Sequence, residues 1–223
     1  MNETSLRRRI MKLYTPAVSD TLDEMGYINS VLDNSIKPLK RGYRIAGPVI
    51  TAHTTVLESY TSIKIEEWLQ VVLPMLEAAK EGSIYVVETG GNKDIASWGE
   101  LMSNSARAKG AVGIITDGAV RDTPKILEIK PPFQVFSASK TPKDAKGRLV
   151  FTSYNEPIKC GGVEVNPGDF AFADDDGVVI IPKEIIEEVV SKAERRVKNE
   201  SAFRVAVKNG MSVTKAFQKY RVF

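Results

Sequence analysis

The sequence has very few of the residues on which several classes of site depend. Among its 223 residues there is one cysteine and one histidine. A single cysteine, Cys160, cannot close an intramolecular disulfide, and this favours a reducing, cytoplasmic setting. The single histidine, His53, leaves little from which to build a Ser-His or Cys-His nucleophile pair. We therefore expect both residues to be structural and the chemistry to come from other side chains.

The sequence also lacks long apolar runs and a large excess of charge of one sign. No apolar stretch approaches the roughly 20 residues that span a bilayer, and the chain begins with the polar, basic run NETSLRRRIMKLY after Met1. Its 31 basic and 28 acidic residues are mostly interspersed, which is typical of a solvated surface and not of a nucleic-acid interface. We expect a soluble, cytoplasmic protein that binds neither nucleic acid nor membrane.

What is present favours one domain of mixed helices and strands. With 43% hydrophobic residues and no linker-like segment, we expect a single core and a single domain over residues 1–223. Helices are predicted over 4–13 and 17–25, with Pro16 between them and Gly26 as the stop of the second. Further elements are an interrupted strand over 43–54, a helix over 65–82 that Pro74 should kink or split, and an amphipathic helix over 183–200.

A strand-helix-strand unit occupies residues 84–117. The segments 84–89 and 111–116 have the composition of buried strands. Between them a helix is predicted, with Ser97 as its N-cap, Glu100 completing a capping box, and Gly110 as its stop. Such a unit places its two strands parallel, so we expect an α/β fold.

The carboxyl edge of this unit collects groups suited to an anionic ligand. The segment DGAVRD, which begins at residue 117, should emerge beside the first helical turn, Gly99 to Met102. Free N–H groups there favour an anion, and the planar fork of Arg121 suits a carboxylate. Asp122 supplies the hard oxygen that Mg²⁺ or Mn²⁺ prefers. The structural alternatives are a local surface salt bridge for Arg121 and Asp122, and a purely capping role for Glu100.

The segment GELMSNSARAKGAVGIITDGAVRD (99–122) resembles the RraA-like family, which includes the 4-hydroxy-4-methyl-2-oxoglutarate aldolases with their oxaloacetate decarboxylase activity. The family pattern is an acidic residue, twenty intervening positions and then Arg-Asp, here Glu100 and Arg121-Asp122. Three more segments resemble family segments in the same order: AVSDTLDEMG (17–26), RIAGPVITAHT (44–54) and VNPGDFAFADDDGVVIIP (165–182).

The resemblance implies a β/β/α swivelling-domain fold that assembles as a trimer or a pair of trimers, a hexamer, with the active site between neighbouring subunits. Asp122 corresponds to the metal-binding aspartate and Arg121 to the arginine that holds pyruvate. Leu101 and Met102 fall where backbone amides contact pyruvate, and Gly99, in the same turn, is counted with them as a substrate-binding residue. Glu100 falls where most members carry an aspartate that holds metal-bound water.

Two departures from the family pattern concern the acidic groups. Glutamate at position 100 is one methylene longer than aspartate, and Lys125 stands where the better-characterised aldolases carry an acidic residue. Glu187, Glu188 and Glu194 of the predicted C-terminal helix are candidates to reach a neighbouring subunit's site. The segment DDDG (174–177) is better explained as a turn than as a metal loop. The pair GG (90–91) is too short to be a phosphate-cradling motif, although it leaves room for the backbone to approach a ligand.

The function implied is a divalent-metal-dependent lyase. It cleaves a 4-hydroxy-2-oxo acid by a retro-aldol reaction and releases pyruvate, and it also decarboxylates oxaloacetate, because both reactions leave the same pyruvate enolate. Two alternatives remain open. One is a non-catalytic regulator that binds a ribonuclease or another protein, and the other is a Schiff-base aldolase that uses a buried lysine.

Overall fold

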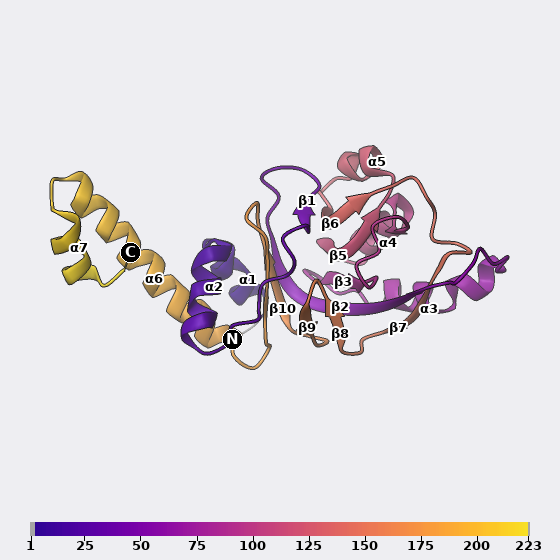
Figure 1. The fold of residues 1–223 in the computed structure, drawn as a ribbon, viewed down its shortest axis with the longest axis horizontal. Coiled ribbons are helices and arrows are strands. Elements are labelled where there is room, and N and C mark those ends of the chain that lie inside the picture. Colours follow the sequence, from indigo (N-terminus) through magenta and orange to yellow (C-terminus); the bar gives the residue numbers. More distant parts are fainter. Residues whose placement is uncertain (1–2, 223) are drawn as a thin grey trace.

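The computed structural model describes residues 3–222, which form seven helices and eleven strands (Figure 1). In chain order these are α1 (Glu3–Ile10), α2 (Thr15–Glu24), β1 (Lys37–Pro38), β2 (Ile45–Val56), α3 (Ile65–Glu77), β3 (Ile84–Glu88), β4 (Ala96–Trp98), α4 (Glu100–Ala108), β5 (Gly113–Val120), α5 (Thr123–Glu128), β6 (Gln134–Lys140), β7 (Leu149–Tyr154), β8 (Ile158–Cys160), β9 (Val163–Val165), β10 (Phe170–Ala173), β11 (Val178–Ile181), α6 (Ile186–Lys208) and α7 (Val213–Tyr220). The α/β class predicted from the sequence is confirmed.

The sheet that carries the site has nine strands. Its main path runs β1-β6-β5-β3-β2-β10-β11, while β4 pairs with β5 and β7 pairs with β2. Strands β2, β3, β5 and β6 are parallel to one another, and β3 and β5 are buried almost throughout. Burial on both faces explains why these central strands are nearly continuous apolar runs. The predicted parallel pairing of β3 with β5 is confirmed, with Tyr85 opposite Ile114.

Strand β2 changes partner along its length as it sweeps across the curled sheet (Figure 1). Ile45–Pro48 pair with β10, Val49–His53 with β3, and Ala52–Val56 with β7. The backbone of β2 at position 47 passes close to the backbone of Gly82. Only glycine fits there, because a Cβ at position 47 would lie 2.0 Å from the carbonyl oxygen of Gly82.

Three apolar clusters fill the interior. One lies between the sheet and α3 and α4, and contains Trp98, which packs on Tyr85 and stacks on Phe133 with ring centroids 5.1 Å and 6.3 Å away. A second lies between the central strands and the β8-β9 hairpin. The third lies where α1, α2 and the first half of α6 cover β10 and β11. The first cluster forms the floor beneath the candidate site.

Both predicted glycine stops are confirmed. Gly26 has φ +88°, its N–H donates to the carbonyl of Asp23, and the N–H of Tyr27 donates to the carbonyl of Leu22. Gly110 ends α4 in the same way with φ +102°. This double hydrogen bond satisfies the last carbonyls of a helix and needs the left-handed conformation that glycine adopts freely.

Two helices differ from their predicted form. Helix α3 continues through Pro74 without being split and ends at Glu77, earlier than predicted. Pro74 is on the exposed side of α3, where a carbonyl that lacks its usual donor can be hydrated. Helix α6 is longer than predicted, and beyond its buried residues Ile186 to Ala193 it projects from the body and carries α7 at its tip (Figure 1).

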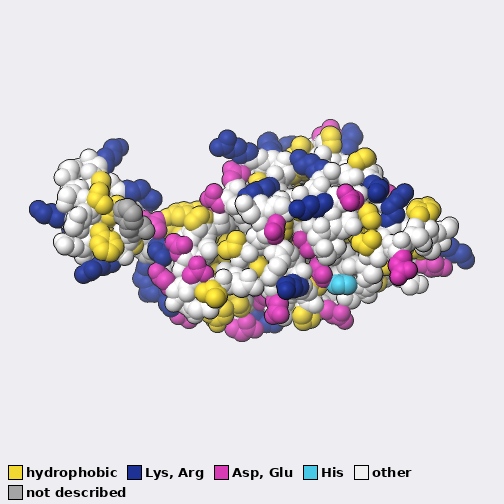
Figure 2. Space-filling model, viewed as in Figure 1, with side chains coloured by type: hydrophobic (Ala, Val, Ile, Leu, Met, Phe, Trp, Pro, Cys, Tyr) yellow, Lys and Arg dark blue, Asp and Glu magenta, His cyan; other side chains and the backbone are white. Residues whose placement is uncertain are grey.

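The surface in Figure 2 shows basic and acidic side chains mixed over the visible face. Within residues 3–222, none of the helices combines the length and apolar character needed to cross a membrane.

Candidate active site

Arg121 and Asp122 are the first residues after β5. This strand begins two residues later than predicted and continues to Val120 with all of its residues buried. Its register against β6 shifts between Thr116 and Ala119. The segment predicted to leave the sheet at residue 117 is therefore an irregular part of the strand, a result of pairing with β6 and β4 that local composition does not encode.

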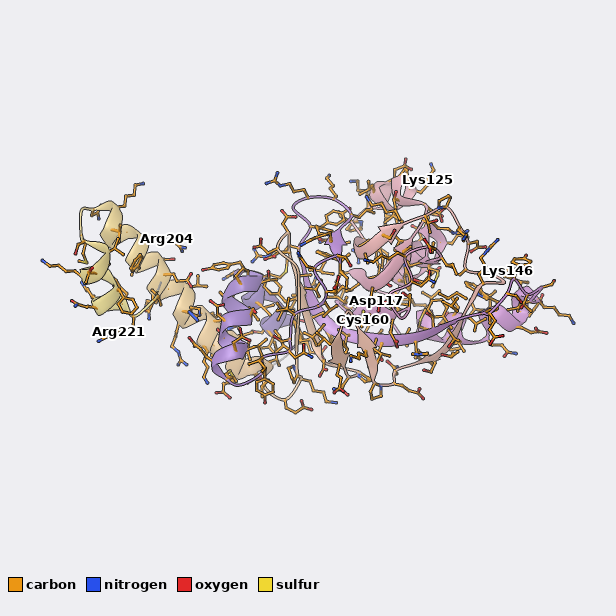
Figure 3. The ribbon with its side chains drawn as sticks, in the orientation of Figure 1. Asp117, Lys125, Lys146, Cys160, Arg204 and Arg221 are labelled. Carbon is orange, nitrogen blue, oxygen red and sulfur yellow. The ribbon has the colours of Figure 1, made fainter. Side chains whose placement is uncertain are left out.

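Asp117 organises this irregular region and lies beside Cys160 (Figure 3). Its buried carboxylate accepts hydrogen bonds from the N–H of Thr89 at 2.7 Å, from the hydroxyl of Thr89 at 2.9 Å, and from the N–H of Gly91 at 3.2 Å. Gly90 and Gly91 both have positive φ. Through these hydrogen bonds Asp117 holds the loop that follows β3 in place.

The predicted capping box is wrong. Ser97 lies in β4, which pairs with β5, and helix α4 begins at Glu100 with Gly99 as its N-cap. Ser97 lies two residues before the N-cap Gly99, and its hydroxyl donates to the carbonyl of Ala119 at 3.5 Å, so it does not cap the helix. A Cβ at Gly99 would lie 2.6 Å from Oδ2 of Asp122. The absence of a side chain at position 99 lets the Arg121-Asp122 pair approach the first turn of α4.

Asp122 has the left-handed backbone conformation with φ 57°, and its side chain does not cap α5. Its Oδ2 accepts the backbone N–H of Glu100 at 3.2 Å and lies 3.5 Å from Nε of Arg121. On Arg121, Nη1 lies 3.1 Å from Oδ1 of Asp144. The guanidinium is thus shared between two carboxylates, and Asp144 was not predicted, because nothing in its local sequence, TPKDAKG, distinguishes it.

One cavity of about 340 Å³ unites most of the predicted site residues. Gly99, Leu101, Met102, Arg121 and Asp122 all line it. The rest of its wall comes from α3, from β4, from Ser105 of α4 and from the segment that contains Asp144 and Lys146. The structure therefore brings the predicted anion-binding and metal-binding groups together, and it adds an apolar helix face that the sequence analysis did not foresee.

Glu100 is placed differently from the other predicted residues. It is the first residue of α4, and its backbone N–H reaches Asp122, but its carboxylate accepts a hydrogen bond from the side-chain amide of Asn104. It does not line the cavity among the described residues. Its predicted role through water stays a prediction. Lys125 projects from α5 and lies 3.2 Å from Glu128 (Figure 3).

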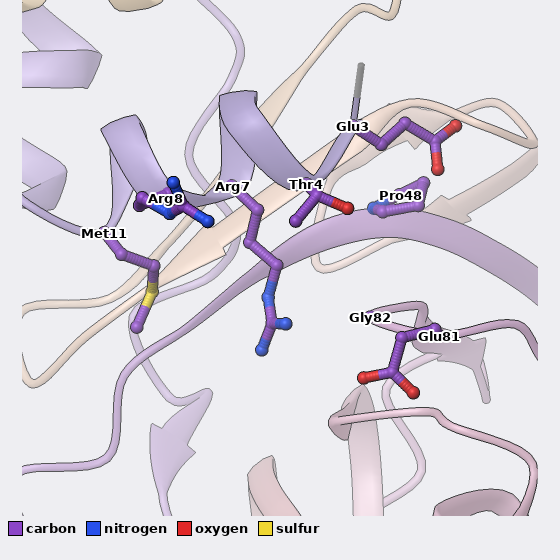
Figure 4. Close-up of a pocket in the computed structure, with 8 residues that line it drawn as sticks. All are labelled: Glu3, Thr4, Arg7, Arg8, Met11, Pro48, Glu81 and Gly82. Carbon is purple, nitrogen blue, oxygen red and sulfur yellow. The ribbon is translucent and has the colours of Figure 1, made fainter.

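A second cavity of about 270 Å³ lies at the other end of β3 (Figure 4). It is lined by Arg7 and Arg8 of α1 and by Glu81 and Gly82, which precede the strand. Nε of Arg7 donates to the carbonyl of Ala46 at 2.9 Å. Ligands of open α/β sheets bind at the carboxyl ends of the strands, so the cavity beside Arg121 is the better candidate.

His53 and Cys160 have the surroundings of structural residues. Nδ1 of His53 lies 2.7 Å from the hydroxyl oxygen of Thr152, and Nε2 lies 3.3 Å from Oε2 of Glu88. Burial raises the pKa of Glu88, while the nearby imidazole opposes the rise. Cys160 is fully buried, and desolvation raises the pKa of its thiol well above the ordinary value.

The donor set fits a hard divalent cation. Within the described part of the chain, no three histidine, cysteine, aspartate or glutamate residues cluster closely enough to form a metal cage. Zinc sites need about three or four such ligands. Mg²⁺ is bound by one or two carboxylates with water in the remaining positions. Asp122 supplies one carboxylate that is partly exposed and free of a capping role.

Comparisons with known proteins agree with this arrangement. Residues 15–180 match the RraA-like family model, described as Aldolase/RraA. The chain belongs to the RraA-like family. The match includes the candidate site and leaves α1, α6 and α7 of this RraA-like chain outside it.

Three relatives show the range of the RraA-like family. The protein DlpA of Legionella pneumophila is 29% identical over 216 residues, which are 97% of this chain but 34% of DlpA, so the chain spans about a third of that relative. The 4-hydroxy-4-methyl-2-oxoglutarate aldolase of Thermus thermophilus is 32% identical over 126 residues, 55% of this chain and 73% of that enzyme. The crystal structure of Streptomyces coelicolor RraAS2, titled an unusual member of the RNase ES inhibitor RraA protein family, has a TM-score of 0.82 and 26% identity over 92% of this chain and 99% of that one.

Proposed function

We propose that this protein is a divalent-metal-dependent lyase that cleaves a 4-hydroxy-2-oxo acid and releases pyruvate. The observation that carries the proposal is the placement of Arg121 and Asp122 in one cavity, against the first turn of α4 at the carboxyl edge of the sheet. The guanidinium of Arg121 can bind the carboxylate of a 2-oxo acid, while the neighbouring carboxylate of Asp122 can bind a divalent ion that the same acid chelates. Relatives named as aldolases support the same reaction class.

The carboxylate of the substrate binds to Arg121 and to the first-turn amides. The planar guanidinium offers two parallel donors that match a carboxylate. The N–H groups of Leu101 and Met102 have no carbonyl one turn earlier in α4, since the first bond of the turn runs from Ser103 to Gly99. Gly99 leaves room for the substrate to reach these donors.

Asp122 would hold the metal, Mg²⁺ or Mn²⁺, directly, and Glu100 would contact it through water. When bound, it supplies a Lewis acid that withdraws electrons from the 2-oxo group. Breaking the C3–C4 bond leaves its electron pair on C3, while the 4-hydroxyl loses a proton and becomes a carbonyl. Arg121 and the amides of α4 stabilise the negative charge on the pyruvate enolate oxygens. Oxaloacetate yields the same enolate when it loses carbon dioxide, so we expect its decarboxylation as well.

We propose that the site is completed in a homotrimer or homohexamer. The side chains of Arg121, Asp122 and Asp144 are 35%, 41% and 43% exposed, which is unusually open for a site that must exclude water. A neighbouring subunit could cover them, as the family resemblance implies. The glutamates Glu187, Glu188 and Glu194 remain candidates for a contribution from a neighbour, although Glu194 already pairs with Arg9.

A regulatory role is the second candidate function. It is favoured by the close structural match to RraAS2, a member of a family titled for ribonuclease inhibition. Such a role uses the protein surface and is compatible with a working lyase site.

The test is pyruvate release from 4-hydroxy-4-methyl-2-oxoglutarate and from oxaloacetate, with Mg²⁺, with Mn²⁺ and with a chelator. We expect release that depends on the metal. Activity that survives the chelator and is trapped by borohydride would replace the metal lyase with a Schiff-base aldolase. Inactivity on both substrates, together with inhibition of a ribonuclease, would favour the regulator.

A further inference from the structure

The cavity beside Arg121 extends well beyond the space that pyruvate needs. It reaches from Arg121 and Asp122 across to α3, and its volume of about 340 Å³ lies in the range of about 300–1,000 Å³ found for small-molecule pockets. The pyruvoyl part of a substrate occupies the Arg121 end. The part of the substrate beyond C4 therefore lies toward α3.

The wall formed by α3 is apolar and fixed in place. The side chains that α3 turns to the cavity follow the spacing of one helix face: Ile65, Trp68, Leu69, Val72, Leu73 and Leu76. The indole Nε1 of Trp68 donates to the carbonyl of Leu149 at 2.9 Å, and its ring meets Phe151 edge-on at 6.2 Å. A wall held in this way is ready for a ligand without rearrangement.

None of the charged side chains that line the cavity belongs to α3. Of the described lining residues, the cationic ones are Arg121 and Lys146, and the anionic ones are Asp122 and Asp144. Helix α3 contributes no polar partner to its part of the wall. A carboxylate placed against it would lose its hydration with nothing in exchange, whereas an apolar group would gain by leaving water.

We infer that C4 of the substrate carries an apolar alkyl or aryl substituent that packs on α3, so that the second product is an apolar aldehyde or ketone. This inference rests on the proposed lyase function and names its substrate class. The reaction balances without an oxidant or reductant. The C3–C4 bond breaks, C3 takes up a proton to give pyruvate, and the 4-hydroxyl gives up its proton as C4 becomes a carbonyl.

The alternative to an apolar substituent is a second carboxylate bound by Lys146. Lys146 lines the same cavity and lies on the side of the molecule away from the α6-α7 arm (Figure 3). If Lys146 bound a second carboxylate, the preferred substrate would be a dicarboxylate, and removing its charge would weaken binding of that substrate alone.

The experiment compares kcat/KM for 4-hydroxy-2-oxo-4-phenylbutanoate and 4-hydroxy-2-oxoglutarate in the wild-type protein with Mg²⁺ or Mn²⁺. We expect the phenyl substrate to be favoured by at least about tenfold, the usual scale for one well-filled apolar subsite. Leu69→Lys and Leu73→Lys place a cation on the α3 wall and should shift the ratio toward the dicarboxylate. Leu73 is 53% exposed, so its variant is not expected to disturb the core.

Gln70→Lys is the matched control. It adds the same charge to the same helix at an exposed position that does not line the cavity, so the substrate ratio should stay as in the wild type. Melting temperature and oligomeric state are measured for every variant. A wild-type preference for 4-hydroxy-2-oxoglutarate that Lys146→Gln removes would overturn the inference. So would a Leu73→Lys variant with an altered oligomeric state and an unaltered substrate ratio, since α3 would then be a contact between copies.

Oxaloacetate separates this inference from the proposed function. Oxaloacetate ends at its C4 carboxylate and has no substituent that could pack on α3. It therefore tests pyruvate formation independently of the α3 wall. Pyruvate from oxaloacetate, with a preference for the dicarboxylic aldol substrate, means that only the assignment of an apolar substituent is wrong. Absence of pyruvate from all three substrates would refute the lyase and the substrate class together.

Discussion

Arg121 divides its guanidinium between Asp144, 3.1 Å from Nη1, and Asp122, 3.5 Å from Nε. Asp144 belongs to a segment that is fastened to the sheet, because the N–H of Ala96 donates to the carbonyl of Lys143 at 2.9 Å and Nη1 of Arg148 donates to the carbonyl of Asp144 at 3.1 Å. The orientation of the Arg121 side chain is therefore set by Asp144, whose backbone segment is held against the sheet. Without that contact the arginine is free to turn toward Asp122 and neutralise the proposed metal ligand.

Asp144→Asn tests this relationship. We expect kcat/KM to fall by about tenfold, mainly through a higher KM for the 2-oxo acid, because Arg121 loses its orientation. Thermal stability should change little, since a half-exposed ion pair contributes about 0–1 kcal/mol. The measurements are steady-state pyruvate release and melting temperature. Asp94→Asn, the same change at an exposed loop position, is the control, and an unchanged KM in Asp144→Asn would show that Arg121 is oriented by other groups.

Asp122→Ala should abolish metal-dependent turnover and leave the protein folded. The carboxylate does not cap α5, so its removal costs the helix little. Activity and direct Mg²⁺ binding by calorimetry are the measurements. Activity close to that of the wild type at limiting Mg²⁺ would exclude Asp122 as the metal ligand.

Arg121→Lys should lower catalytic efficiency by at least about tenfold, which corresponds to about 1.4 kcal/mol of transition-state stabilisation. A point charge cannot reproduce the two-pronged contact with a carboxylate, nor the simultaneous contacts with Asp122 and Asp144. A lysine variant that keeps full efficiency would contradict the carboxylate clamp.

Glu100→Gln distinguishes a chemical role from a structural one. If Glu100 acts through water at the metal, loss of its charge should reduce turnover by about one to two orders of magnitude with little change in melting temperature. Glu67→Gln, the same change at an exposed position of α3 that does not line the cavity, serves as the control and should leave turnover and melting temperature unchanged. Full activity of Glu100→Gln would leave Glu100 with no role beyond its contact with Asn104.

The contact between α1 and α6 should be acid-sensitive. Glu194 accepts two hydrogen bonds from Arg9, at 2.9 Å and 2.6 Å, and they lower the pKa of the glutamate below its ordinary value of 4.5. A carboxyl with a depressed folded-state pKa stabilises the protein above its unfolded-state pKa and loses that contribution as the pH falls through the folded-state pKa. Glu194→Gln should therefore lose less melting temperature than the wild type between neutral pH and about pH 3. Glu188→Gln, on the same helix and paired with Lys192, controls for the loss of one charge.

The features predicted correctly from the sequence are those that local bonds determine. The stops at Gly26 and Gly110 depend on hydrogen bonds within a single turn, and the parallel strands β3 and β5 begin with the apolar runs IYVV and GII. The wrong predictions concern long-range pairing. Ser97 has the local preference of a helix cap, yet β4 forms because β5 is beside it.

The parts of the site that were not predicted come from distant segments. Asp144 meets Arg121 because the connection between β6 and β7 folds back onto β4. Trp68 and Met102 line the same cavity because α3 and α4 pack against the same apolar cluster. A pattern read along the chain contains no information about such encounters, since each depends on how two separate elements pack in space.

Strand β2 is shared by the two layers of the molecule, because it pairs with β10 at one end and with β3 further along. Its first residues belong to the layer covered by α1, α2 and α6, and its later residues support β3, from whose end the loop toward the active site departs. Because both layers use this backbone, we expect them to unfold together as one cooperative unit. We therefore expect loosening at the α1-α2-α6 end to reach the floor of the cavity, and the amides of β3 and β10 to exchange hydrogen only through the same global unfolding.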